Sequence, residues 1–455
     1  MRFAPRRSGL LLPLLAVACA ACASGGGGAA IRINDVTPQS IPSLEAAKSQ
    51  HPQDPNTLTR LGVAYFKAGR YQDARPVLDS AIAHQPDNGV AAIYLGMTDE
   101  QLGDFPAAKR AYADYVAVAR NAELKKTAQQ RLALADRRAM IYQARQDLAN
   151  EPALARMPPE SNTVAVMPFI YSGSDSTVAP LGRGLAQLLV TDLAKSRQIR
   201  VLERERMQAI LDEMKLSDSA QVDPATAIRS GRMLRAAEVV QGTMATLPGD
   251  QLRVDAAVVS VASAQVKASA GNQDPLDRLF DLEKALAFSI FNNLGIQLSP
   301  AEREAINQRP TKNLQAFLAY SRGLMAQDNG DFGAAQADFD RASVLDPGFQ
   351  AALQGAAAAS QLSAASQQTV PQVEATVAQA TVEAPTAPVT SAQQQALLEG
   401  TSSVNPSTGE QLSNQMGSPG GSQPPANKNP VQEAGNDEGA QTPTGTLIIV
   451  IQRPK

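Results

Sequence analysis

The stretch LTRLGVAYFKAGRYQDARPVLDSAIAHQP, residues 58–86, decides the fold of the first part of the chain. Its apolar residues recur at helical spacing, which predicts two successive helices. Gly62 and Ala74 are small, so the two helices can approach closely in an antiparallel pair. Tyr65 and Leu78 would fill the space between them. The stretch therefore predicts a helical hairpin.

The same pattern recurs along the chain. The pair Leu61-Gly62 returns after 34 residues as Leu95-Gly96, although Tyr115 and Arg120 stand where alanine and proline would recur. A half repeat lies upstream of the first copy and a full copy lies far downstream. Their matching residues are Leu44, Ala47 and Pro52 in the half repeat, and Gly323, Gly330, Ala335, Phe339, Ala342 and Pro347 in the downstream copy.

This pattern resembles the tetratricopeptide repeat (TPR) family. The resemblance implies an α-helical solenoid whose concave face, lined by the first helix of each hairpin, binds an extended segment or a helix of a partner protein. We expect repeats with a capping helix (residues 122–150) over 40–150, and a C-terminal repeat over 312–362. The groove residues carried over by offset are Asn56, Thr59, Val63, Phe66, Lys67, Val90, Ile93, Met97 and Glu100. Alternatively, some of these side chains only pack against the next repeat.

The composition limits the chemistry that the chain can perform. It has two histidines and two cysteines in 455 residues, so a zinc site or a histidine-dependent nucleophile has few possible members. His51 and His84 both lie next to proline-marked turns. The formal net charge of -3 gives no electrostatic basis for binding nucleic acid. We expect no catalytic residues, no metal and no cofactor.

The N-terminus has the features of an export signal. Basic residues precede the apolar run LLLPLLAVA (10–18), which is too short to span a bilayer. Small residues then lead to Cys19 and Cys22, an arrangement that resembles a lipoprotein signal over residues 1–22. Cys19 is the favoured lipidation site, with Cys22 as the alternative. Cleavage by the ordinary signal peptidase at Ala18-Cys19-Ala20 or Ala21-Cys22-Ala23 also remains open. In enteric lipoproteins, an Asp directly after the lipidated cysteine is the signal for retention in the inner membrane. No Asp follows either cysteine here, which favours the periplasmic face of the outer membrane.

From residue 163 the periodicity changes to alternating strands and helices. Apolar runs predict strands at 163–169, 199–202, 237–242, 252–259 and 265–269, and helical spacing predicts helices at 181–195, 205–214, 224–234 and 276–294. Asp223 and Pro224 are typical of the N-cap and first position of a helix. The order predicts an α/β domain with a mixed sheet over 160–298.

Several motifs of this domain resemble the curli-secretion (CsgG-type) family, over about residues 163–296. They are MPF (167–169), VLER (201–204) leading into Ile210-Leu211, VDPATA (222–227), Gly231 followed by Ala236-Ala237, and VQG (240–242) followed by RVDA (253–256). The resemblance implies a periplasmic domain that can self-associate into rings. Pore-forming members also insert two hairpins per subunit into the membrane, and each hairpin needs roughly twenty residues. Here the first insertion point holds only the short turn 247–251. The second, after Val266, holds a brief run of mostly polar and small residues that leads to Leu276. We therefore expect no pore.

A glycine pair and a charged run in this domain do not predict a nucleotide-binding or catalytic site. The glycines of Gly182-Arg183-Gly184 lack the third glycine of a dinucleotide loop. The charged run ERER (203–206) is predicted to be a solvated helix start.

The C-terminal part is rich in Gln, Ser, Thr, Pro, Gly and Ala, which predicts a disordered linker over 363–445. The last apolar segment, TLIIVIQ (446–452), is a strand that could add to a sheet edge, or a frayed terminus.

Together these features predict a multidomain, non-catalytic scaffold lipoprotein on the periplasmic side of the outer membrane. Its partners would be other envelope proteins, bound through the TPR groove, and further copies of itself, bound through the CsgG-like domain. It would contact the membrane through the lipid anchor and would act in envelope assembly or secretion. The alternative is a CsgG-type subunit of an outer-membrane secretion channel.

Overall fold

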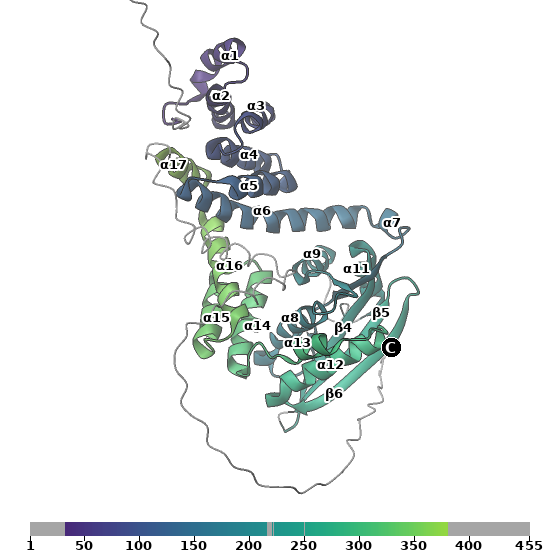
Figure 1. The fold of residues 1–455 in the computed structure, drawn as a ribbon. Helices are drawn as coiled ribbons and strands as arrows, with labels where there is room; N and C mark the ends of the chain where they lie inside the picture. The colour runs from purple at the N-terminus through teal and green to yellow at the C-terminus, as the bar shows by residue number, and fades with distance from the viewer. Residues whose placement is uncertain (1–31, 216–220, 222, 250, 381–455) are drawn as a thin grey trace, which may run out of the picture.

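The structure is a computed structural model that describes residues 32–215, 221, 223–249 and 251–380. Within these residues the chain forms an N-terminal helical array, a mixed sheet flanked by helices, and a second group of helices (Figure 1). The expected order of helical repeats around an α/β domain is confirmed. The signal segment with Cys19 and Cys22, the linker beyond residue 380 and the segment 446–452 lie outside the described residues.

The N-terminal array is built from antiparallel helices. Asp and Asn side chains before α2, α4, α5 and α6 accept amide hydrogens of the first helical turn and so fix where these helices begin. After a short 3-10 helix at Pro38–Ser40, the helices are α1 (Ile41–Gln50), α2 (Pro55–Lys67), α3 (Tyr71–His84), α4 (Gly89–Gln101), α5 (Phe105–Val118) and α6 (Ala122–Ala149).

The predicted repeats share one packing contact between their two helices. A glycine of the first helix lies against a large side chain of the second, sixteen residues further along, so closely that an added Cβ would lie 2.3–2.5 Å from it. These contacts join Gly62 to Leu78, Gly96 to Tyr112, and Gly323 to Phe339. The downstream copy therefore packs in the same way as the two N-terminal ones.

A mixed sheet forms the centre of the α/β domain. Its strands are β1 (Glu160–Val166), β2 (Ile170–Tyr171), β3 (Arg200–Val201), β4 (Ala236–Leu247), β5 (Gln251–Ser260) and β6 (Gln265–Pro275). The order is β3-β1-β4-β5-β6, with β2 also paired to β4. Strand β1 is parallel to β3 and β4, whereas β4, β5 and β6 form an antiparallel meander.

Helices cover both faces of this sheet. Successive residues of β1 point to opposite faces, so its alternate residues are buried under different helices. Val164 and Val166 pack with α8 (Leu181–Leu193) and α12 (Leu279–Asn293). Ala165 packs on the other face with α9 (Arg204–Met214) and α11 (Pro224–Leu234). Helix α11 has Asp223 as its N-cap, as predicted. Short helices α7 (Glu151–Leu154) and α13 (Pro300–Asn307) precede and follow the domain.

The connections of the meander are short. Strands β4 and β5 pair up to Leu247 and Gln251, and Gly249 turns the chain with a φ of +80°. Residues 261–264 join β5 to β6. Strand β6 is longer than the predicted 265–269, since its polar residues pair with β5 as far as Pro275. Both predicted insertion points therefore hold tight turns or paired strand.

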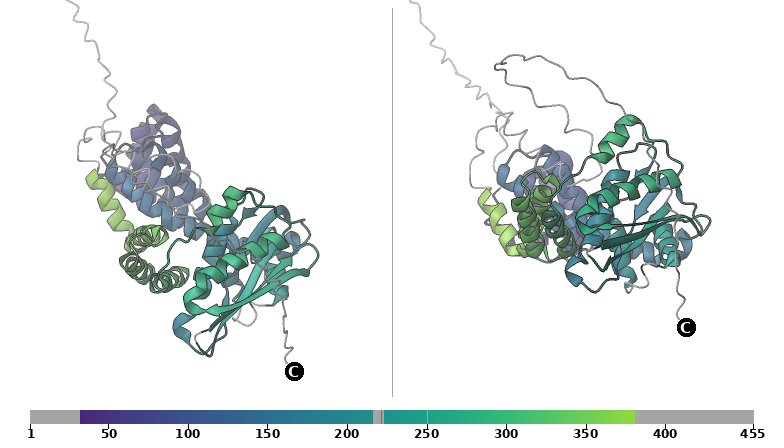
Figure 2. Two further views of the ribbon diagram at one scale, coloured as in Figure 1. Left: turned by 60° about the horizontal axis from the view of Figure 1, so that its bottom comes forward. Right: turned by 90° about the horizontal axis from the view of Figure 1, so that it is seen from below.

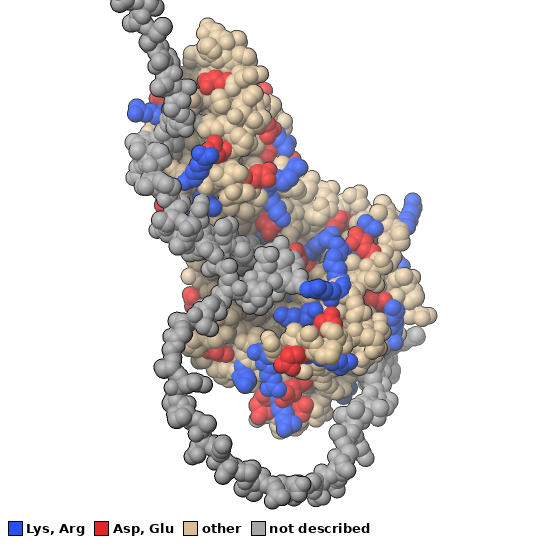
Figure 3. Space-filling model, in the orientation of Figure 1, with Lys and Arg blue, Asp and Glu red and all other residues tan. Residues whose placement is uncertain are grey.

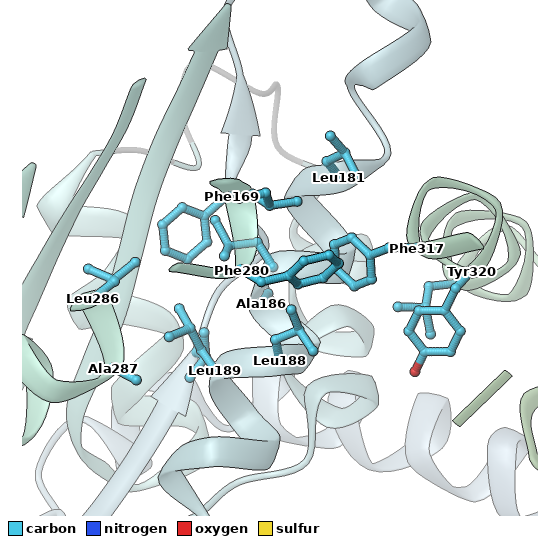
Figure 4. Close-up of a cluster of buried hydrophobic side chains, with 14 of the residues drawn as sticks. Phe169, Leu181, Ala186, Leu188, Leu189, Phe280, Leu286, Ala287, Phe317 and Tyr320 are labelled. Atoms are coloured by element: carbon cyan, nitrogen blue, oxygen red, sulfur yellow. The ribbon is translucent and has the colours of Figure 1, made fainter. Parts of the chain in front are cut away.

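The C-terminal helices share a core with the sheet. They are α14 (Leu314–Asp328), α15 (Phe332–Leu345) and α16 (Gln350–Gln367). Phe317 of α14 lies edge-on to Phe280 of α12, with ring centroids 5.3 Å apart (Figure 4). A Cβ on Gly184 would lie 2.1 Å from Ser321 Oγ, so this glycine lets α14 pack against α8. The predicted C-terminal repeat is therefore continuous with the α/β domain.

Helix α6 connects the array to the α/β domain. Leu124 and Ala128 near its start are buried in the core of the array, whereas Ala144 near its end is buried in the core beneath α9. The predicted capping helix thus joins two cores instead of closing one.

The predicted linker is helical in its first part. Helix α16 runs to Gln367, and a further helix, α17 (Val370–Ala380), lies beside the N-terminal array (Figure 2). The prediction of disorder from residue 363 is wrong as far as residue 380. Its physical reason is tertiary: Val373 and Val377 are buried in the core of the array, a contact that composition alone does not reveal.

Candidate protein-binding surface

The first helices of the N-terminal hairpins, α2 and α4, line up with α6 to form one face of the array, here called the A face. The nine predicted groove residues lie on α2 and α4, and six of them are buried: Thr59, Val63, Phe66, Val90, Ile93 and Met97. Asn56 is exposed and Lys67 is half-buried. The side chain of Glu100 is only 4% exposed. Most of the predicted groove is therefore not open to solvent.

Part of this burial comes from contacts between successive helices. Asn88 Nδ2 donates a hydrogen bond of 2.8 Å to Thr59 Oγ1. The Phe66 ring lies edge-on to the Tyr94 ring at a centroid distance of 5.2 Å. For Thr59 and Phe66, the alternative that groove residues pack against the next repeat describes the structure.

The N-terminal segment covers another part of the A face. Ile33 and Val36 are each 1% exposed and belong to the core of the array. Lys67 Nζ donates a hydrogen bond of 2.9 Å to Val36 O, and Arg60 pairs with Asp35 at 2.8 Å. Lys67 is thus already engaged by the chain itself.

Helix α17 covers the opposite end of the A face. It packs against α6, with Val373 and Val377 fully buried. Tyr94 Oη donates a hydrogen bond of 3.2 Å to Glu374 Oε1, and Asn121 Nδ2 donates one of 3.3 Å to Ala380 O. Burial, followed by the nearby Glu374 carboxylate, raises the pKa of Tyr94, so its hydroxyl stays a donor.

Glu100 anchors a charged network at the end of α4. Its carboxylate accepts hydrogen bonds from Arg131 at 3.1 and 2.5 Å, from Arg138 at 2.7 Å and from Tyr112 Oη at 2.7 Å. Burial and then the Glu100 charge raise the pKa of Tyr112 well above its usual value. This carboxylate holds α4 to α5 and α6 and is saturated with donors, so its role is structural.

A second buried network lies where the modules meet. Arg204, whose side chain is 0% exposed, donates from Nη1 to both carboxylate oxygens of Asp328 at 2.8 Å. Arg183 donates to the same carboxylate at 3.1 Å, and Arg137 of α6 donates to the Asp328 carbonyl at 2.8 Å. The prediction that residues 203–206 are a solvated helix start is wrong for Arg204, because Asp328 of α14 lies directly over it.

A cleft of about 330 Å³ lies between α5, α6 and α9. It is lined by apolar side chains and by side chains of both charges. Its lining includes Lys109, Arg110, Asp136, Met140, Asp147 and Arg206. On the face drawn in Figure 3, basic and acidic side chains are intermixed, with a run of basic ones between the array and the α/β domain.

The described residues offer no arrangement typical of metal chemistry. No group of three His, Cys, Asp or Glu side chains in them is placed to hold a metal ion. His51 and His84 are exposed. In the same part of the chain, no helix has both the length and the apolar character needed to cross a membrane.

Comparison with known families identifies the modules. Residues 152–270 match the model of the curli production assembly/transport component CsgG family. Residues 29–89 and 65–132 match models of tetratricopeptide repeats. The chain contains a CsgG-type domain preceded by tetratricopeptide repeats. Both predicted resemblances are confirmed, and the A face belongs to the TPR array.

Two solved structures are also similar to parts of the chain. The C-terminal domain of LpoB from Salmonella enterica is 12% identical, covering 28% of this chain and 94% of its own, with a TM-score of 0.22. A tetratricopeptide repeat protein from Parabacteroides merdae is 13% identical, covering 69% of this chain and 91% of its own, with a TM-score of 0.20. Comparison with curated proteins gives no match.

Sequence reasoning missed the residues through which α17 contacts the A face. Tyr94 lies between the predicted groove positions Ile93 and Met97, and no signal in the sequence distinguishes it from other core aromatics. Val373 and Val377 have helical spacing, a signal that could have predicted α17. The composition of the surrounding segment, dominated by Ala, Gln and Thr, masked it.

Proposed function

We propose that this protein is a non-catalytic scaffold lipoprotein of the outer membrane, on its periplasmic side. It binds envelope proteins through the TPR array and the CsgG-type domain during envelope assembly or secretion. The main support for this proposal is that one helix, α6, belongs to both modules. Its Ala128 is buried in the core of the array and its Ala144 in the core of the α/β domain. Two interaction modules are thereby held in a fixed relation, as a scaffold requires.

The lipid anchor is attached at Cys19, with Cys22 as the alternative. The described chain begins against the array, where Ile33 and Val36 are buried. An extended chain spans at most about 3.6 Å per residue, so the array would lie within roughly 50 Å of the lipidated cysteine. The scaffold would therefore work close to the membrane surface.

The short connections of the sheet favour a tether over a channel subunit. A strand that crosses a membrane needs about 9–11 residues, whereas β4 turns into β5 between Leu247 and Gln251. Reconstitution in lipid bilayers tests this directly. Reproducible ion conductance from the purified protein would overturn the scaffold proposal in favour of the channel alternative.

Anchoring and partner binding are tested in cells. Metabolic labelling with an alkyne fatty acid should mark the parent protein and the C22A variant but not C19A. If neither the parent protein nor any variant is labelled, the chain has no lipid anchor. If the parent and C19A are labelled but C22A is not, the anchor is at Cys22.

A photocrosslinking residue at Asn56, exposed on α2, should capture envelope proteins. The matched control is Ser80, exposed on α3 away from the A face. Equal capture at both positions would contradict partner binding by the A face. Crosslinks from Asn56 to another copy of the chain would place self-association at the array instead of at the CsgG-type domain, to which we assign it.

A further inference from the structure

Helix α17 occupies the A face in the manner of a bound ligand. Its buried residues, Val373, Val377 and Ala380, follow the i, i+4, i+7 spacing of one helix face. The opposite face, including Gln372 and Gln379, is exposed. The helix thus contributes one apolar stripe to the array and nothing to the core of the C-terminal helices from which it extends.

The attachment of α17 is weak in its own right. A helix of 11 residues is marginal in water, so α17 depends on the array for its structure. Its buried stripe consists of two valines and one alanine. A short connection at Gln368 and Thr369 links it to α16, and this covalent tether gives it a high effective concentration at the A face. The tether thus compensates for a small contact.

Besides the hydrogen bond from Asn121 to the end of the helix, the array contacts one of its polar side chains, Glu374. Tyr94 is 0% exposed, and its hydroxyl donates to Glu374. A buried tyrosine hydroxyl needs a hydrogen-bond partner. Any helix that replaces α17 must therefore bring an acceptor, or let water reach Tyr94.

We propose that α17 is an internal ligand of the A face, and that the partner of the array is a helical segment of the same chemistry that displaces it. Such a segment carries a β-branched residue at i and i+4, a small residue at i+7 and a carboxylate at i+1. The inference rests on the proposed function, since it takes the array to be a protein-binding module. It adds the class of partner and the contact that must open first.

The test uses the full chain and a fluorescent peptide of residues 369–380 as the probe. In the V377D variant a charge replaces a fully buried side chain and should release α17 from the A face. The variant should bind the peptide at least tenfold more tightly than the parent protein, by fluorescence anisotropy. Q379D is the matched control, because it adds the same charge on the exposed side of α17. It should bind the peptide no better than the parent.

Hydrogen exchange shows directly whether α17 has been released from the A face. Exchange of the α17 amides should accelerate at least tenfold in V377D and stay unchanged in Q379D. A milder variant, Y94F, removes only the hydrogen bond to Glu374 and should accelerate that exchange severalfold without unfolding the array. Fast exchange in V377D without peptide binding, even at the roughly millimolar concentration that a short tether supplies, would overturn the inference. So would dimers of the parent protein held together by exchanged α17 helices, because the occupant would then be a second copy.

The two proposals fail separately. If the peptide binds V377D but Asn56 captures nothing in cells, the scaffold function is wrong and the helix-binding surface stands. If Asn56 captures envelope proteins but the peptide does not bind V377D, the scaffold function stands and the internal-ligand inference is wrong.

Discussion

The substitution D328A should destabilise the junction between the modules. Arg204 is completely buried and its two shortest hydrogen bonds, both 2.8 Å, go to the Asp328 carboxylate. Burial alone would lower the pKa of Arg204, but Asp328 more than compensates, so the guanidinium stays charged. Removing the carboxylate leaves that charge without its main counterion.

The expected cost follows from measurements on buried ion pairs, in which removal of one partner costs about 3–5 kcal/mol. Glu205 and Gln187 each still accept a hydrogen bond from Arg204, at 3.2 Å. We therefore expect the lower end, about 3 kcal/mol, and a fall in Tm of about 6–12 °C.

The chain has no Trp, so thermal unfolding is followed by circular dichroism at 222 nm. The control is D338A, which breaks the half-exposed pair between Arg322 and Asp338 and should cost less than about 1 kcal/mol. The double variant R204M/D328L replaces the buried pair with apolar side chains and should recover most of the loss. If D328A is as stable as D338A, Asp328 is not the counterion on which the buried Arg204 depends.

Three other substitutions test the packing and the buried carboxylates. G96A should cost about 1–3 kcal/mol in urea unfolding, because the new Cβ would lie 2.3 Å from the Tyr112 ring. Burial, only partly offset by Arg75, raises the pKa of Asp99 to about 6. The folded state therefore holds that proton more tightly than the unfolded state, and stability falls as pH rises from about 4 to 6. D99N should remove this loss and melt higher than the parent at pH 7.5 but not at pH 4. Burial, followed by the nearby Asp192 carboxylate, raises the pKa of Glu283 well above its usual value, because both disfavour a charge at this position. E283Q keeps the shape of the side chain without its charge and should not lower the Tm at pH 7.

Each of these three variants has an outcome that would contradict its expected effect. A G96A protein with the parent's unfolding midpoint would contradict the close approach of α4 and α5. An equal shift of D99N at both pH values would mean that the carboxyl is not protonated in the folded state near pH 5. A large loss of stability in E283Q would mean that Glu283 is ionised and supports its neighbour Lys284.

The repeats and the order of the α/β domain were predictable because local geometry fixes them. Gly62 and Gly96 have no substitute where two helices cross so closely. Asp223 and Pro224 mark a helix start through contacts within a few residues. Signals of this kind lie entirely within the segment they describe.

What could not be predicted depends on distant partners. Arg204 looks like one more charge in a polar run until Asp328, 124 residues away, is placed over it. The burial of Val63 and Ile93 reflects the packing of the whole array. Helix α17 is stabilised by its contacts with α6, which its own composition does not encode.

The continuity of α6 has a further consequence for the evolution of this chain. At 28 residues, the helix is about 42 Å long. One inserted residue would turn everything beyond it by about 100° and advance it by about 1.5 Å. The array and the sheet would then face different directions, and Ala144 could no longer meet α9. Insertions and deletions that a surface loop would tolerate would therefore rotate one end of α6 relative to the other. The length of α6 sets the angle between the two modules.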